Sequence, residues 1–238
     1  MLSKALTFFT NATNGFLSLI YPNNCVVCDE ELPDKMNKLC FNCSNDLHYT
    51  FFEKYSESTM ADELFWGRIQ LANVYSLLFY EKGNSTQTIL HKIKYQEGQE
   101  LGVLMGELTG DRIYRMDWIK EVDGIVPIPL HSKKAFKRGF NQSLLIAKGF
   151  AERTELPIVN GLRRKRHHQS QTKKSKEERY ENVKSIFAVN ELQLENKHHL
   201  IIIDDVLTTG STLESAARTI RKKYPEIKIS LVTVAIAK

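Results

Sequence analysis

The alternation of hydrophobic and polar positions divides most of the chain into short strands and helices. Apolar runs of strand length occupy residues 71–80, 123–129, 186–189, 199–203 and 227–237. Apolar positions at helical spacing occupy residues 142–154, 211–224 and 85–110, the last with a break near Gly98. The run at 199–203 is nearly continuous, as in a parallel strand that is buried on both faces. Strands that alternate with helices in this way predict an α/β fold with an open parallel sheet.

Two polar stretches follow neither period. Residues 50–67 are polar and acidic, and we interpret them as a linker. Residues 161–182 are long for a connection within a compact domain, and loops of this length are usually lids or disordered segments. We interpret this second stretch as a lid. The expected domains are an N-terminal module at residues 1–65 and the α/β domain at residues 66–238.

Residues 2–21 are rich in apolar side chains, but their pattern is not that of an export signal. Asn11, Asn14 and Gly15 interrupt the run and no small-residue cleavage site follows, so neither a signal peptide nor a spanning helix is expected. The apolar residues fall on one helical face, which favours docking onto the protein's own core over a partner or a membrane surface. We therefore expect a cytoplasmic protein without a membrane span.

The four cysteines form two C-x-x-C pairs separated by eleven residues, and they are Cys25, Cys28, Cys40 and Cys43. Two such knuckles can bring four thiolates to the corners of a tetrahedron around zinc. A redox dithiol would need only one pair, and a reducing cytoplasm disfavours disulfides. Four protein ligands leave no open position for a reactive water, so we predict a structural zinc ion. Asp29 and Ser44 follow the knuckles where glycine is common, and Asp tolerates left-handed geometry better than most residues.

Composition limits the number of domains, and the distribution of charge indicates the kind of ligand. With 238 residues, of which 42% are hydrophobic, the chain can bury one substantial core and a small extra module. The net charge is +5, yet fourteen Lys and Arg stand against four Glu between residues 133 and 179, so the rest of the chain is net acidic. A basic run is by default a solvated face, but its place next to a phosphate-type motif favours polyanionic ligands.

The stretch after the apolar run at 199–203 carries the clearest chemistry. Asp204 and Asp205 end the expected strand, and residues 207–212 read Leu-Thr-Thr-Gly-Ser-Thr before a helix. Small hydroxyl residues and a glycine let the backbone turn tightly and aim N–H groups at one point, where a phosphate fits. The two carboxylates can accept hydrogen bonds from neighbouring sugar hydroxyls or hold magnesium on a pyrophosphate. In an open α/β sheet, ligands bind at this end of the strands.

Residues 201–212 resemble the phosphoribosylpyrophosphate (PRPP) signature of type I phosphoribosyltransferases. Further stretches resemble one branch of these proteins, the ComF family, and they are residues 127–142, 163–171, 179–183 and the four-cysteine module. Together they cover nearly the whole chain. The resemblance implies a phosphoribosyltransferase-like sheet with a small zinc-ribbon-like module at the N-terminus. It also implies a role in DNA uptake during natural competence, in which incoming single strands are handled on the cytoplasmic side.

The resemblance also implies roles for individual residues. Asp204 and Asp205 would contact the ribose as catalytic residues, and the 5-phosphate would be held by Leu207, Thr208, Thr209, Gly210, Ser211 and Thr212. The pyrophosphate loop would contain Leu130, His131 and Ser132, and its diphosphate would be neutralised by Lys133, Lys137 and Arg138. The family's mobile loop corresponds to residues 163–176, which begin with Arg163, Arg164, Lys165 and Arg166. The sequence contains no hood that would identify an acceptor base.

Two classes of function are consistent with this pattern. As a binding protein, the chain would hold PRPP or a nucleotide phosphate while its basic surface and aromatic residues such as Phe136 and Phe140 grip single-stranded DNA. As a phosphoribosyltransferase, it would use magnesium and PRPP to transfer ribose 5-phosphate to a nitrogenous acceptor and release pyrophosphate. We favour the first class, with a competence helicase or recombination proteins as further partners.

Overall fold

The computed structural model describes residues 23–33, 38–95, 98–131, 136–165 and 186–237. The expected N-terminal helix at residues 2–21 and most of the expected lid lie outside these residues. The chain divides into two units, Met1–Leu47 and His48–Lys238. Residues 48–65, which the sequence assigns to the N-terminal module, are part of the larger unit.

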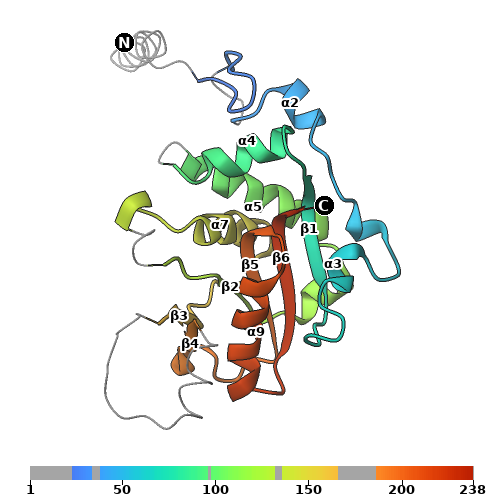
Figure 1. Ribbon diagram of the computed structural model, residues 1–238, viewed down its shortest axis with the longest axis vertical. Helices are drawn as coiled ribbons and strands as arrows, with labels where there is room; N and C mark the ends of the chain where they lie inside the picture. The colour runs from blue at the N-terminus through green and yellow to red at the C-terminus, as the bar shows by residue number, and fades with distance from the viewer. Residues whose placement is uncertain (1–22, 34–37, 96–97, 132–135, 166–185, 238) are drawn as a thin grey trace, which may run out of the picture. The chain divides into compact units, whose positions relative to one another are not determined.

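A four-stranded parallel sheet forms the centre of the larger unit (Figure 1). Its strands, in spatial order, are β1 (Val74–Tyr80), β6 (Lys228–Ala237), β5 (His199–Leu207) and β2 (Gly124–Pro127). The predicted parallel sheet is thus confirmed, and β5 is buried along residues 199–203. Strand β2 ends at Pro127, opposite Ile203, whereas β5 continues beside β6 as far as Leu207. The last four residues of β5 therefore extend past the paired end of β2.

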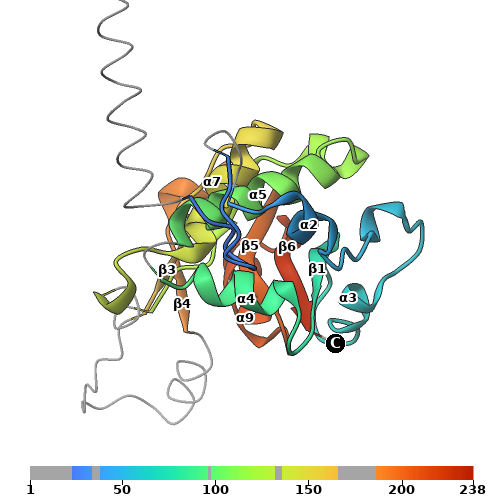
Figure 2. The ribbon, with the colours of Figure 1, turned by 90° about the horizontal axis from the view of Figure 1, so that it is seen from above.

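The predicted helices are also present. They are α4 (Ser85–Lys92), α5 (Gln99–Ile113), α7 (Gln142–Thr154) and α9 (Ser211–Lys223), and the expected break near Gly98 separates α4 from α5. Figure 2 shows α5 and α7 together on one face of the sheet and α9 on the opposite face. Shorter helical turns are α2 (Phe41–Asn45), η1 (Phe52–Lys54), α3 (Met60–Glu63), η3 (Asp117–Glu121) and η4 (Glu191–Gln193). Within the described part of the chain, every helix is too short or too polar to cross a membrane.

A small antiparallel pair lies outside the main sheet. It consists of β3 (Leu162–Arg164) and β4 (Phe187–Val189), with Arg163 opposite Ala188. The sequence predicted β4, whose three residues are apolar or small, as a strand. It assigned β3 to the lid because two of its three residues are arginines.

Helices α5 and α7 approach each other unusually closely because glycines line their contact. A Cβ atom added at Gly106 would lie 2.0 Å from the carbonyl oxygen of Ile146, and one added at Gly149 would lie 1.9 Å from that of Val103. Such distances are far below any van der Waals contact, so only hydrogen fits at these two positions. The separation of the two helices is therefore set by backbone against backbone.

Residues 48–65 pack against the sheet and do not form the polar linker that the sequence suggested. Tyr49 forms an antiparallel bridge with Leu78 of β1, and the ring of Phe52 meets that of Phe79 edge-on at 5.9 Å. The bridge covers part of the open edge of β1, where unpaired N–H and C=O groups would otherwise be exposed. The linker interpretation was wrong because the buried residues of this segment are too widely spaced to produce a helical or strand period.

Candidate functional site

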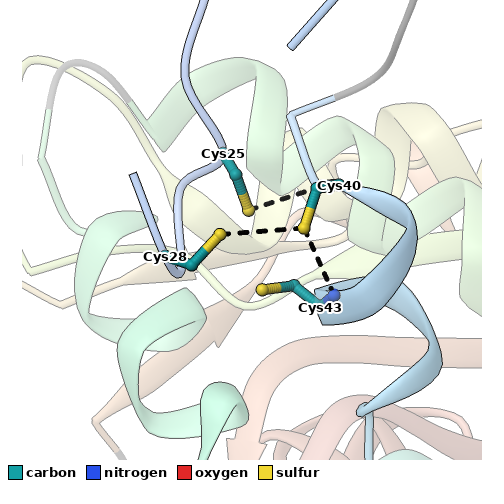
Figure 3. A group of neighbouring side chains, drawn as sticks. All are labelled: Cys25, Cys28, Cys40 and Cys43. Atoms are coloured by element: carbon teal, nitrogen blue, oxygen red, sulfur yellow. Dashed lines mark hydrogen bonds between the residues drawn. The ribbon is translucent and has the colours of Figure 1, made fainter. Parts of the chain in front are cut away.

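The four cysteines converge in the small unit, as their spacing predicted. Their Sγ atoms all lie within 4.8 Å of one another (Figure 3). Two backbone N–H groups donate to sulfur, from Cys40 to Cys25 Sγ at 3.3 Å and from Cys43 to Cys40 Sγ at 3.4 Å. The first knuckle closes at Asp29, whose φ of 60° is the left-handed geometry expected there. The second knuckle continues into α2, so Ser44 is helical.

This arrangement fits a zinc ion. Tetrahedral Zn–S bonds of about 2.3 Å require sulfurs about 3.8 Å apart, and Cys28 Sγ lies 3.7 Å from Cys40 Sγ. Burial alone would raise the pKa of Cys25, but backbone N–H groups of Cys28, Cys40 and Val27 lower it to about 6. Burial and the neighbouring sulfurs raise the pKa of Cys43. Four thiolates this close repel one another, and a divalent cation would remove that penalty.

A second cluster of polar residues lies in the larger unit, at the carboxyl end of β5. Asp204 and Asp205 belong to the stretch of β5 that extends past β2, and both are partly buried. The Ser143 hydroxyl, in the first turn of α7, donates to Asp204 Oδ1 at 2.7 Å. Burial, and then the charge of Asp205, raises the pKa of Asp204 to about 7 even though the Ser143 hydrogen bond opposes the shift. Its carboxyl group can therefore be protonated or ionised near neutral pH.

The expected phosphate loop follows Asp205 and leads into α9. Gly210 has a φ of +73°, a left-handed conformation that favours glycine, and α9 begins at the next residue without a side-chain cap. Helices α3, α4 and α7 all have such caps, from Thr59, Asn84 and Asn141 respectively. The first N–H groups of a helix have no intrahelical acceptor. In α9 these groups are available to an anion, apart from a long 3.5 Å contact between the Ser211 N–H and the Thr209 hydroxyl.

The side chains of the loop differ in their exposure. Leu207 and Gly210 are buried, and the exposed residues are Thr208, Thr209, Ser211 and Thr212. The hydroxyl groups of Thr209 and Ser211 lie 2.9 Å apart. Exposed hydroxyl groups thus lie on both sides of Gly210, next to the first N–H groups of α9.

Three cationic side chains from separate elements act on the two carboxylates. Arg164, in β3, lowers the pKa of Asp204, although burial dominates. Burial also raises the pKa of Asp205, and the charges of Lys94 and Arg138 oppose that effect. The sequence predicted Arg138 and Arg164 but missed Lys94.

The remaining predicted residues have more varied positions. Leu130 and His131 follow β2 and are partly buried. Arg163 and Lys165 are the exposed neighbours of Arg164, the last residue of β3. Lys137 precedes Arg138 in a short helical turn. Ser132, Lys133 and Arg166 lie outside the described residues. No sequence pattern singles out Ser143, since serine is common in the first turn of helices whether or not it contacts a functional site.

A known protein family matches the part of the chain that contains this polar cluster. The family described as phosphoribosyl transferase domain matches residues 141–238, which include α7, β5, the phosphate loop and α9. A solved structure, the glutamine PRPP amidotransferase from Bacillus subtilis, covers 58% of this chain and 27% of its own. Its sequence identity to this chain is 17% and the TM-score is 0.38.

Two curated relatives are competence proteins. Competence protein F of Haemophilus influenzae is 23% identical over 213 residues, which are 87% of this chain and 88% of that protein. Competence protein ComFC of Bacillus subtilis is 34% identical over 110 residues, or 46% of this chain and 43% of that protein, so the match spans less than half of ComFC. Together with the phosphoribosyltransferase-like sheet and the cysteine cluster near the N-terminus, these matches support the ComF family for this chain.

Proposed function

We propose that the carboxyl end of β5 binds the 5-phosphoribosyl group of PRPP or of a nucleotide. The observation that carries this proposal is the succession of two partly buried carboxylates, a glycine turn and an uncapped helix N-terminus. A 5-phosphate would accept hydrogen bonds from the N–H and hydroxyl groups of residues 208–212. The ribose hydroxyls would then face Asp204 and Asp205, which accept hydrogen bonds when ionised.

Cationic residues extend the proposed site toward a diphosphate. Lys94, Arg138 and Arg164 come from three elements and already influence the two carboxylates. Magnesium bound with PRPP would neutralise part of the diphosphate charge. Ionised Asp204 and Asp205 offer the oxygen ligands that magnesium prefers, and a bound cation would draw the raised pKa of Asp204 back down.

We further propose that the whole protein binds single-stranded DNA on the cytoplasmic side of the membrane, in addition to the ligand at the end of β5. The competence relatives support a role in DNA uptake. The basic segment between residues 133 and 179 supports contact with a phosphate backbone. Within this segment, Arg163 and Lys165 are exposed on either side of Arg164, whose charge acts on Asp204.

The alternative function is transfer of ribose 5-phosphate from PRPP to a nitrogenous acceptor. One observation favours it, namely that the pKa of Asp204 lies at about 7. A group with such a pKa can exchange a proton at neutral pH, which suits general acid or base catalysis.

Two measurements test these proposals. Calorimetric titration of PRPP with and without magnesium should show saturable binding to one site per chain, and the absence of binding would reject the ligand proposal. Release of pyrophosphate from PRPP, followed in the presence of candidate acceptor bases, then separates the two functions. Turnover with any one base would establish the transferase, whereas binding without release would support the ligand-binding protein.

A further inference from the structure

The segment that follows α3 packs directly beneath the phosphate loop. Phe65 is 2% exposed, and a Cβ atom added at Gly210 would lie 2.7 Å from its ring. The ring therefore fills the space that a side chain at position 210 would need. Gly210 is restricted twice, by its left-handed φ and by Phe65, so the turn of the loop depends on this segment.

Arg68, three residues after Phe65, joins the segment to the loop and to α9. Its Nη1 donates to the carbonyl oxygen of Thr209 at 2.9 Å and to that of Leu64 at 2.8 Å. Its Nε donates to Glu214 Oε2 at 2.9 Å, and its Nη2 forms an ion pair with the same oxygen. One planar guanidinium group thus links the loop, the first turn of α9 and its own segment.

A second arginine holds Arg68 in this position. The Nε of Arg218 donates to Glu214 Oε1 at 2.8 Å, and its Nη2 donates to the backbone carbonyl of Arg68. The Glu214 carboxylate is therefore shared between two arginines, one on each side. Burial would raise the pKa of Glu214, but these two partners lower it, so the carboxylate stays ionised at neutral pH.

We infer that Arg68 is a positioning residue for the phosphate loop. It holds the Thr209 carbonyl away from the anion position while it ties the loop to α9, so the N–H groups of residues 210–212 keep their arrangement before any ligand arrives. A preorganised loop loses less conformational entropy on binding, which raises affinity without a direct contact. This inference rests on the proposed function, because it assumes that the loop binds the 5-phosphate. Lysine could not replace Arg68 fully, since an ammonium group lacks the fork that reaches three acceptors.

The test compares Arg68→Ala and Arg68→Lys with Arg221→Ala. Arg221 is a matched control because it also reaches from α9 to this segment, where its Nη1 donates to the Gln70 carbonyl at 2.9 Å. Among the described residues, Arg221 makes no hydrogen bond to the loop. The ligands are ribose 5-phosphate and magnesium pyrophosphate, titrated separately. We expect Arg68→Ala to lower the affinity for ribose 5-phosphate about ten-fold and Arg68→Lys to lower it less. The affinity for magnesium pyrophosphate should be unchanged in both variants. Arg221→Ala should change the affinity for neither ligand.

Hydrogen exchange gives a second readout that needs no ligand. The amide of Glu214 donates to the Gly210 carbonyl at 2.8 Å and so joins α9 to the loop. It should exchange about ten-fold faster in Arg68→Ala and less so in Arg68→Lys, while amides of β6 keep their wild-type protection. Unchanged exchange of this amide, or equal weakening of both ligands, would overturn the inference. An equal effect of Arg221→Ala would also overturn it, because the loop would then depend on general packing. If the wild type binds no ribose 5-phosphate, the proposed function fails, and the exchange result still decides whether Arg68 positions the loop.

Discussion

The cysteine cluster and the polar end of β5 are built in opposite ways. All four sulfurs come from residues 25–43, and two knuckles are enough to bring them together. The end of β5 instead gathers side chains from distant parts of the chain, such as Lys94, Ser143 and Arg164 around Asp204 and Asp205. A local cluster depends on spacing alone, whereas the distributed site exists only when the whole sheet is folded.

This difference also predicts how each site responds to loss of its ligand. We expect metal binding to the small unit to be coupled to its folding, because the unit has too few residues for a core of its own. The sheet has a large apolar core, so we expect it to fold without a ligand. We therefore expect the cysteine unit to need its metal to stay folded, and the sheet to stay folded without a ligand at its polar end.

Loss of metal is the largest expected effect. Purified protein should contain about one zinc per chain, and Cys25→Ser or Cys40→Ser should abolish it, because three thiolates bind zinc far more weakly than four. Elemental analysis measures the metal, and circular dichroism should show the sheet still folded. Ser44→Ala, in the same module, should keep its zinc. Protein purified without chelator that contains no zinc, or that shows iron–sulfur absorption, would contradict the prediction.

The reverse experiment removes the carboxylates. Asp204→Asn combined with Asp205→Asn should weaken magnesium-dependent PRPP binding at least about ten-fold, since each lost charged contact contributes roughly 1.5–3 kcal/mol. Zinc content should not change, and Asp117→Asn, at an exposed site, should bind PRPP as the wild type does. Calorimetric titration measures the affinities. Equal affinity in the double variant would mean that the two carboxylates are structural.

The next prediction asks whether the basic residues 163–166 bind single-stranded DNA or serve only the ligand site. Affinity for single-stranded DNA should fall with salt, with a log–log slope of about −0.7 for each phosphate neutralised. Replacing Arg163, Arg164, Lys165 and Arg166 with Ala should reduce both affinity and slope, which titration of labelled strands at three salt concentrations would show. If the quadruple variant loses affinity for PRPP but not for DNA, residues 163–166 contribute to the ligand site and not to DNA binding. A salt-insensitive or absent interaction in the wild type would remove the DNA proposal.

The smallest expected effect is on the pH dependence of stability, which follows from the raised pKa of Asp204. Its folded pKa of about 7 exceeds the value of about 3.9 for an unfolded chain. Its contribution to stability is therefore complete below about pH 4 and is lost as the pH rises through 7. Asp204→Asn should be more stable than the wild type at pH 8, on the order of 1 kcal/mol, with a smaller difference at pH 5. Urea unfolding at both pH values measures this.

The control for that measurement is Asp117→Asn. The hydrogen bond and the charge of Lys120 lower the pKa of Asp117, so removing this carboxyl should not stabilise the protein at high pH. An Asp204→Asn variant that is no more stable than the wild type at pH 8 would show that the carboxyl is better solvated than its burial indicates.

Sequence patterns predicted the features that are encoded over short distances. The alternating strands and helices indicated the parallel sheet, and the order of residues 204–212 located the polar end of β5 because strand, turn and helix are consecutive there. The positions of Ser143 and Lys94 were not predictable, since they depend on where α7 and the turn after α4 lie relative to the end of β5. Phe65 and Arg68 were missed for a different reason. Their segment is polar on average, and its few buried side chains act through contacts with distant residues.

The close crossing of α5 and α7 also limits how this protein can evolve. Position 106 would meet a backbone carbonyl of α7 if it carried any side chain, and position 149 would meet one of α5. Substitutions there cannot be rescued by a smaller neighbour, because the obstacle is main chain. Helix α7 also carries Ser143, so a shift that admitted a larger residue at Gly149 would move the partner of Asp204. Lineages that retain the ligand site should thus keep glycine at both positions, even while the surrounding apolar residues exchange freely.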